Sequence, residues 1–241
     1  MDYSHNSGYA VIARYGIMPA MNQTVANHPY AKVLLTLAGV LALLLGLWTA
    51  RQLMHTPAAL PTLTSATALP APRPLTPFTL TDHHGQTFDL ARFKGAWTFL
   101  FFGYTHCPDV CPTTLATLNS VMKKIADAGP QHMPVRVVFV SVDPQRDTVQ
   151  HLAEYVPYFN KDFLGVTGTS AQLDAFTAQL NIMHMRGSET AADGGYTVDH
   201  TASILLIDPE ARFSAIFSVP HVATTLAKDF LSLRSYYEDL Q

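Results

Sequence analysis

The sequence predicts an α/β domain that follows a single N-terminal transmembrane helix. Two observations carry this prediction. Residues 33–50 (VLLTLAGVLALLLGLWTA) form an apolar run of eighteen residues without a charge. From residue 78 onward, short apolar runs alternate with longer amphipathic segments, a pattern typical of a central sheet covered by helices. The chain of 241 residues therefore divides into an anchor and one tethered domain.

The apolar run lies between Lys32 and Arg51. At 1.5 Å per residue it spans most of a hydrocarbon core of about 30 Å, so we predict a transmembrane anchor over residues 32–51. A cleaved signal peptide is the alternative. The length of the run and of the 32 residues before it argues against that alternative, and no small-x-small site follows directly.

Basic residues near the helix indicate its orientation. Arg14 and Lys32 precede it, whereas only Arg51 follows closely, which favours a cytoplasmic N-terminal segment over residues 1–31. We expect a bacterial inner-membrane protein with a single span and its domain in the periplasm.

Residues 52–77 are rich in proline and predict a semi-rigid, extended linker. The following domain, residues 78–241, contains eleven Lys/Arg and seventeen Asp/Glu, a formal balance of −6. This acidic balance argues against a nucleic-acid-binding surface.

The first half of the domain contains two strand-helix units. Residues 78–90 predict a hairpin because two half-apolar runs flank a turn at 82–85. Residues 96–104 (AWTFLFFGY) have the continuous apolar character of a buried strand, and a helix follows over residues 111–129. Residues 135–143 predict a second buried strand, and residues 148–158 predict the next helix.

The second half closes the domain. Residues 171–180 predict a helix, and residues 202–219 predict two strands joined by a turn at 208–211. A last helix is expected over residues 222–237. This order of elements suits a thioredoxin-like fold with insertions.

The only two cysteines, Cys107 and Cys111, lie four residues apart in HCPDVCP, where the first buried strand meets its helix. If Pro108 is the first helical residue, Cys107 lies at the cap and Cys111 one turn further on the same face. The helix N-terminus stabilises a thiolate, so we expect Cys107 to be the more acidic thiol.

Three interpretations of the cysteines differ in chemistry. A structural disulfide is possible in an exported domain, but a bridge that closes so short a loop stabilises little. A thiol-disulfide oxidoreductase usually has C-x-x-C, one residue shorter than the spacing found here. A metal site is the third interpretation, because two thiolates select Cu(I) or zinc and one imidazole would complete an S₂N set.

The segment GYTHCPDVCPTTL (residues 103–115) resembles the copper-binding segment of the Sco/SenC family. Members of that family are copper chaperones and thiol reductases that help assemble the CuA centre of cytochrome c oxidase. Further similar segments follow in the expected order: SVDPQRDT (141–148), GVTGT (165–169) and VDHTASILLIDPEARF (198–213). The resemblance covers roughly the whole of residues 78–241, and an N-terminal anchor with a linker is also usual in the family.

The resemblance implies that Cys107, Cys111 and His200 bind one copper ion per domain, as Cu(I) or Cu(II), and that the two cysteines form a redox-active disulfide. It implies delivery of copper to the copper-bearing subunit of cytochrome c oxidase, after supply by an upstream copper carrier. A thiol-disulfide reductase of the oxidase copper-site cysteines and a copper or redox sensor are the alternatives, so enzymatic activity stays open.

Three further features are weaker candidates. Met183 and Met185 could bind Cu(I) through their thioethers, but we interpret them as ordinary packing residues. We expect His106 to contribute to the surroundings of the site rather than to ligate. Asp147 is expected to cap the helix that starts near Thr148.

Overall fold

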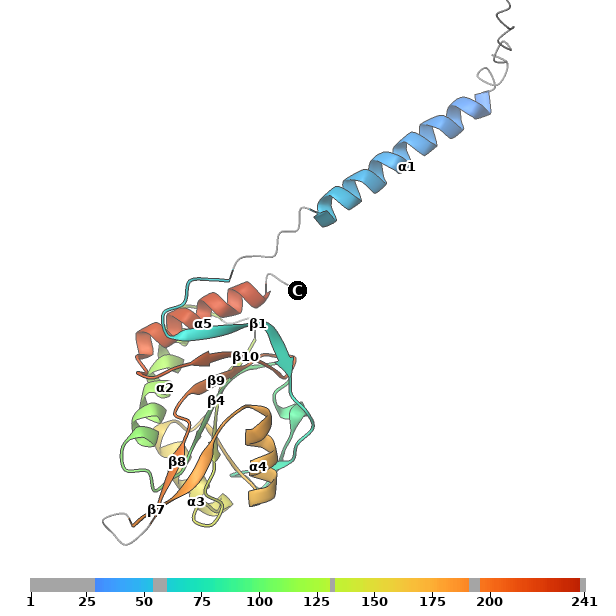
Figure 1. The fold of residues 1–241 in the computed structure, drawn as a ribbon. Helices are drawn as coiled ribbons and strands as arrows, with labels where there is room; N and C mark the ends of the chain where they lie inside the picture. Colours follow the sequence, from blue (N-terminus) through green and yellow to red (C-terminus); the bar gives the residue numbers. More distant parts are fainter. Residues whose placement is uncertain (1–28, 54–59, 131–132, 191–195, 239–241) are drawn as a thin grey trace, which may run out of the picture. The chain divides into compact units, whose positions relative to one another are not determined.

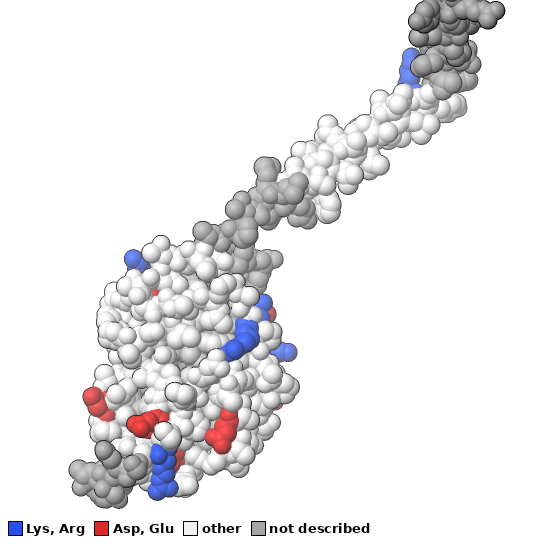
Figure 2. All heavy atoms as spheres, in the orientation of Figure 1, with Lys and Arg blue, Asp and Glu red and all other residues white. Residues whose placement is uncertain are grey.

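The helix α1, Pro29–Leu53, belongs to the first of two compact units into which the chain divides. The computed structural model describes residues 29–53, 60–130, 133–190 and 196–238. Within α1, Tyr30–Arg51 has a mean hydropathy of 2.3 and is 0% buried, so its apolar side chains, white in Figure 2, are exposed. The helix is long and apolar enough to cross a membrane. The predicted segment 1–31 lies almost entirely outside the described residues.

The second unit is an α/β domain built on an eight-stranded sheet (Figure 1). The sheet contains β1 (Ala66–Pro74), β2 (Leu80–Asp82), β3 (Thr87–Phe88), β4 (Trp97–Gly103), β5 (Val135–Ser141), β6 (Leu164–Thr167), β9 (Ile204–Ile207) and β10 (Arg212–Phe217). The helical elements of this unit are η2 (Leu90–Arg92), α2 (Val110–Asp127), α3 (Val149–Phe159), α4 (Ser170–Gln179) and α5 (Ala223–Glu238). A separate hairpin is formed by β7 (His184–Thr190) and β8 (Tyr196–His200).

The order of the strands across the sheet is β1-β10-β9-β4-β5-β6-β2-β3. The three central strands β4, β5 and β6 are parallel, and α2 and α3 connect them. The remaining strands pair antiparallel on both sides of this centre. The arrangement confirms the predicted α/β, thioredoxin-like fold.

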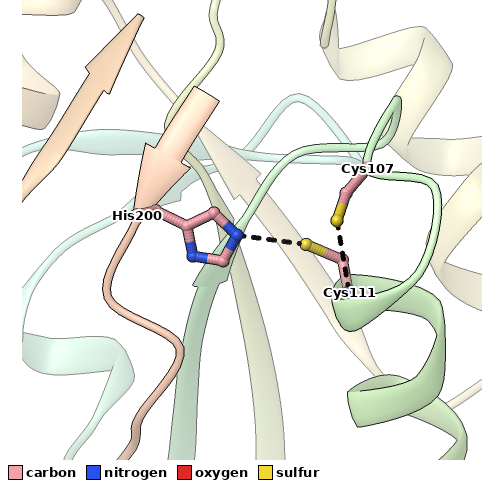
Figure 3. A group of neighbouring side chains, drawn as sticks. All are labelled: Cys107, Cys111 and His200. Atoms are coloured by element: carbon pink, nitrogen blue, oxygen red, sulfur yellow. Dashed lines mark hydrogen bonds between the residues drawn. The ribbon is translucent and has the colours of Figure 1, made fainter. Parts of the chain in front are cut away.

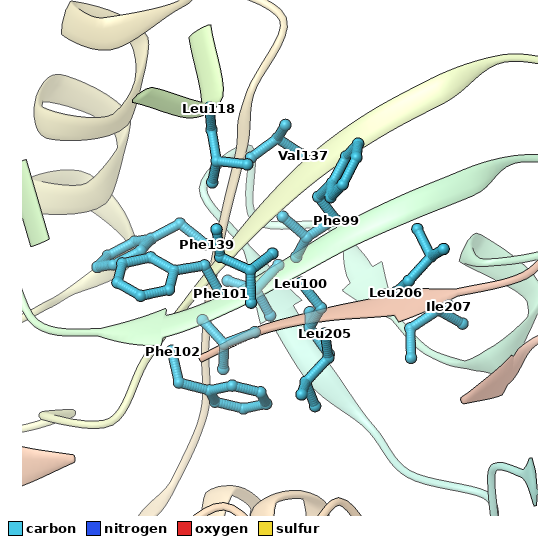
Figure 4. Packing of buried hydrophobic residues seen from close by; sticks show 14 of the residues in the cluster. Phe99, Leu100, Phe101, Phe102, Leu118, Val137, Phe139, Leu205, Leu206 and Ile207 are labelled. Atoms are coloured by element: carbon cyan, nitrogen blue, oxygen red, sulfur yellow. The ribbon is translucent and has the colours of Figure 1, made fainter. Parts of the chain in front are cut away.

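Helices pack against both faces of the sheet at the central strand β4, and all seven residues of this strand are buried. On one face, the ring centroid of Phe99 lies 5.1 Å from that of Phe230 on α5. On the other face, Phe102 lies 5.9 Å from Phe176 on α4. Alternation of side chains along the strand produces this division, and Figure 4 shows the filled layers around it. The segment that follows β4 therefore starts from a rigid support.

Part of the predicted linker is wrong, because β1 forms an edge strand of the sheet and pairs with β10. Proline lacks the N–H that a central strand needs, but an edge strand tolerates it. The pairing is interrupted between Ala68 and Arg73, where Pro70 and Pro72 lie. The same prolines that predicted a spacer are thus accommodated in an irregular edge.

A buried carboxylate, Asp229 on α5, fixes the start of β1. Its Oδ2 accepts hydrogen bonds from the backbone N–H groups of Thr64, Ser65 and Ala66 at 3.0, 2.6 and 3.0 Å. The Ser65 hydroxyl donates to the same oxygen at 2.9 Å. Because Asp229 is only 1% exposed, these four donors offset the cost of burying its charge.

We predict that Asp229→Ala lowers the free energy of unfolding of the domain by about 1–3 kcal/mol, because it leaves buried backbone donors without an acceptor. Thermal unfolding of the full chain in detergent measures the change. Asp127→Ala at the exposed end of α2 is the matched control and should change stability by less than about 0.5 kcal/mol. Equal unfolding temperatures of the two variants would contradict the proposed role of Asp229.

Candidate metal centre

The two cysteines lie on either side of the start of α2. Cys107 is half-buried in the loop that leaves β4, and Cys111 is fully buried in the first turn of the helix. The condition that Pro108 is the first helical residue is not met, because α2 begins at Val110 and Asp109 is its N-cap residue. The backbone N–H of Cys111 nevertheless points at the Cys107 Sγ, 3.4 Å away (Figure 3). A helix N-terminus therefore stabilises negative charge on that sulfur.

The two thiols differ strongly in acidity. A hydrogen bond from the Cys111 thiol, helped by a hydrogen bond with His200 and by the backbone N–H groups at the helix start, lowers the pKa of Cys107 to about 3. The same hydrogen bond, together with burial, raises the pKa of Cys111. In the reduced, metal-free protein Cys107 is thus a thiolate and Cys111 holds the proton, as expected for the thiol nearer the helix start.

A glycine makes room for the buried sulfur. A Cβ atom at Gly103, the last residue of β4, would lie 2.7 Å from the Cys111 Sγ and 2.8 Å from the Phe139 ring. Neither neighbour has space to retreat, because both residues are fully buried. The absence of a side chain at this position sets where the Cys111 sulfur lies.

His200 approaches the cysteines from the last position of β8. Its Nε2 lies 3.4 Å from the Cys111 Sγ, and its Nδ1 lies 3.2 Å from the carbonyl oxygen of Thr201 (Figure 3). A carbonyl oxygen can only accept, so the tautomer with its hydrogen on Nδ1 donates to Thr201 and leaves the Nε2 lone pair free for a metal ion. This is the orientation that a histidine adopts as a metal ligand.

The structure brings together all three residues that the sequence singles out. The Cys107 and Cys111 sulfurs and a ring nitrogen of His200 all lie within 4.8 Å of one another. Two sulfurs and one imidazole nitrogen suit Cu(I) or zinc, and a small adjustment of side chains would place all three around one ion.

One loop supports the cysteine side of this group. The carboxylate of Asp147, fully buried, accepts hydrogen bonds from the backbone N–H and the hydroxyl of Thr105 and from the hydroxyl of Ser141. The prediction that Asp147 caps α3 is wrong, because Thr148 is the N-cap residue and accepts from the His151 N–H. Asp147 instead holds the loop that carries Cys107.

The same loop supports the histidine side. The Asp143 carboxylate accepts a hydrogen bond of 2.6 Å from the Tyr196 hydroxyl and a second from the Arg146 guanidinium. That guanidinium stacks over the Tyr196 ring, 3.7 Å from its centroid. Because Tyr196 begins β8 and His200 ends it, these contacts fix the strand that carries the imidazole.

A pocket of about 530 Å³ opens beside His200 and is lined in part by Met183 and Met185. The two methionine side chains are 80% and 69% exposed, so the interpretation of them as ordinary packing residues is wrong. The sequence could not separate packing from exposure here, because the apolar character of methionine fits both.

A family model described as SCO1/SenC matches residues 67–234 of the chain. Among curated relatives, the mitochondrial SCO2 homolog of Bos taurus is 38% identical over 141 residues, which are 58% of this chain and 52% of that protein. The chain therefore spans about half the length of this relative.

Two solved structures are similar to the domain. Arabidopsis thaliana ScoI with copper bound has 34% sequence identity and a TM-score of 0.62, over 67% of this chain and 98% of that chain. Bradyrhizobium japonicum ScoI with copper bound also has 34% identity, with a TM-score of 0.57 over the same shares of the two chains.

We predict that alkylation of Cys107 by iodoacetamide in the reduced, metal-free chain is nearly independent of pH between about pH 5 and pH 8. The lowered pKa keeps this sulfur a thiolate over the whole range. An ordinary thiol slows about tenfold for each unit below its pKa of about 8.5. Mass spectrometry locates the modification, and the denatured chain is the control. A tenfold rise per pH unit at Cys107 in the folded chain would contradict the stabilised thiolate.

Proposed function

The chain belongs to the SCO1/SenC family, and we propose that it is a copper-binding metallochaperone that delivers copper to the CuA site of cytochrome c oxidase. The observation that carries the proposal is the convergence of Cys107, Cys111 and His200, whose ligand atoms lie within 4.8 Å of one another. The resemblance of the domain to ScoI proteins with copper bound supports the choice of metal. These three residues are the proposed ligands of one copper ion per domain.

Copper binding would use the two thiols differently. The Cys107 thiolate is ready to bind, whereas the Cys111 thiol must first release its proton. Binding of Cu(I) then forms two copper–sulfur bonds and liberates one proton to solvent. In the tautomer with its hydrogen on Nδ1, His200 would complete the set through the Nε2 lone pair without further proton release.

The ligand set would accept copper in both oxidation states. Thiolates favour Cu(I), and an imidazole makes Cu(II) accessible. Oxidation of Cys107 and Cys111 to a disulfide would remove two of the three ligands and abolish binding. Copper delivery would therefore depend on the redox state of this pair.

The proposed setting follows from the anchor. Helix α1 is suited to cross a membrane, and the basic residues before it favour a cytoplasmic N-terminus. We place the protein in a bacterial inner membrane with its domain in the periplasm. The proposed partners are the copper-bearing subunit of cytochrome c oxidase and an upstream copper carrier.

A thiol-disulfide reductase is the second candidate, and the contrast between the two sulfurs favours it. The Cys107 thiolate would attack a disulfide of the oxidase copper site and form a mixed disulfide, releasing one thiolate of the target. Cys111, after losing its proton, would then displace the second target thiolate. The target gains two electrons, and the Cys107–Cys111 pair becomes a disulfide.

We predict that His200→Ala weakens Cu(II) binding to the reduced full chain at least tenfold, because it removes the only nitrogen from the proposed set. Competition with a chelator of known affinity measures the change. His221→Ala is the control, since its Nε2 binds the Ala202 carbonyl and not the cysteines. Unchanged Cu(II) affinity in His200→Ala would refute the ligand assignment, while disulfide formation should persist in this variant.

The dependence on His200 also separates the two candidate functions. We predict that His200→Ala largely loses copper transfer to a purified oxidase subunit but keeps most of its reduction of a disulfide in that subunit. Cys107→Ser should lose both. Full copper transfer by His200→Ala would argue for the reductase as the primary role. Absence of transfer even from the copper-loaded wild-type chain would instead favour a copper or redox sensor.

A further inference from the structure

A second group of side chains that could bind a metal ion includes His106, the residue before Cys107. One ligand atom each from His106, Asp147 and His151 lies within 4.8 Å of the other two. His106 comes from the loop after β4, Asp147 from the loop after β5, and His151 from the first turn of α3. Two segments distant in sequence, one after β4 and one after β5, thus converge on one point.

The ring of His106 faces this group. Its Nδ1 lies 3.7 Å from Asp147 Oδ1, and the centroids of the His106 and His151 rings lie 5.7 Å apart. His106 shares no hydrogen bond with the Cys107 or Cys111 sulfur among the described residues. The group therefore has no ligand in common with the proposed copper site, although one peptide bond joins His106 to Cys107.

The hydroxyl of Thr105 lies among the three side chains. Its Oγ1 is 3.1 Å from His106 Nδ1 and 3.0 Å from His151 Nε2, and it donates to Asp147 Oδ1 at 2.5 Å. In this arrangement the hydroxyl links two imidazoles to one carboxylate. A cation that replaced these hydrogen bonds would find the ligand atoms already gathered around it.

The carboxylate supplies the reason to expect a cation. Asp147 is 0% exposed, and buried carboxylates are usually paired with a positive charge or bound to a metal ion. Among the described residues its one ion-pair partner within 4.0 Å is His106, which is charged only when protonated, and the Arg146 guanidinium attracts it from a greater distance. A divalent cation would balance the buried charge and would be reached through the exposed side of His106, whose side chain is 44% exposed.

We propose that His106, Asp147 and His151 form a second metal site, for a divalent ion of borderline softness such as Cu²⁺ or Zn²⁺. Two imidazoles and one carboxylate suit these ions, whereas two thiolates with one imidazole favour Cu(I). The thiolates of the first site also favour Cu(I), whereas the second site, which lacks sulfur, would bind divalent ions. The second site stands independently of the proposed chaperone function, because none of its ligands belongs to the first.

The test uses the full chain in detergent with the first site removed by Cys107→Ser, Cys111→Ser and His200→Ala. Cu²⁺ and, separately, Zn²⁺ are titrated against a competing chelator, before and after His151→Ala is added. His221→Ala in the same background is the matched control. It also removes one histidine, and the histidines common to the two variants bind the added metal ion equally in each. We expect His151→Ala to weaken the tightest binding at least tenfold and His221→Ala to change it less than twofold.

Electron paramagnetic resonance of the Cu²⁺-loaded background identifies the ligands. Coupling to two imidazole nitrogens is expected, and coupling to one after His151→Ala. His106→Ala should also remove the coupling to one nitrogen. Because His106 is exposed, this variant shows whether the effect of His151→Ala comes from a lost ligand or from a folding defect. The proposal would be overturned if three variants showed equal metal affinity and equal nitrogen coupling: His151→Ala, His106→Ala and His221→Ala. The three proposed ligands would then be only part of a hydrogen-bond network around Thr105.

Discussion

The arrangement of the candidate metal centre depends on two buried carboxylates in one short loop after β5. Asp147 holds the loop before Cys107 through Thr105, and Asp143 holds β8 through Tyr196. A buried carboxylate is costly unless its oxygens accept hydrogen bonds, so neither partner can move away without a penalty. The cysteines and the histidine come from segments 89 residues apart, and this loop fixes both against the same strand end.

The sequence was sufficient for the fold class and for the elements that are buried. The strand β4 and the helix α2 were predictable because an apolar run and a helical spacing of apolar residues leave few alternatives. Cys107 and Cys111 were predictable as a pair, since they are the only cysteines and lie at the junction of these elements. The family resemblance added His200, which no local pattern distinguishes from the other ten histidines.

The remaining features depend on tertiary contacts that local patterns do not record. The prolines of β1 indicated a spacer, but the edge of a sheet accepts them. The hairpin of β7 and β8 has little apolar alternation in its sequence, and Asp143 and Arg146 contact it through Tyr196. Asp147 resembled a helix cap in sequence, and only the fold brings Thr105 and Ser141 to its oxygens instead.

The unequal burial of the two sulfurs gives the proposed copper site an inner and an outer side. Cys111 is closed off by Gly103 and the Phe139 ring, whereas Cys107 and His200 remain half-exposed. Incoming ligands of an acceptor could therefore reach a bound ion only from the outer side. Ligand exchange at the copper ion would be sequential and directional. An acceptor ligand would replace Cys107 or His200 first, and the Cys111 sulfur would dissociate last.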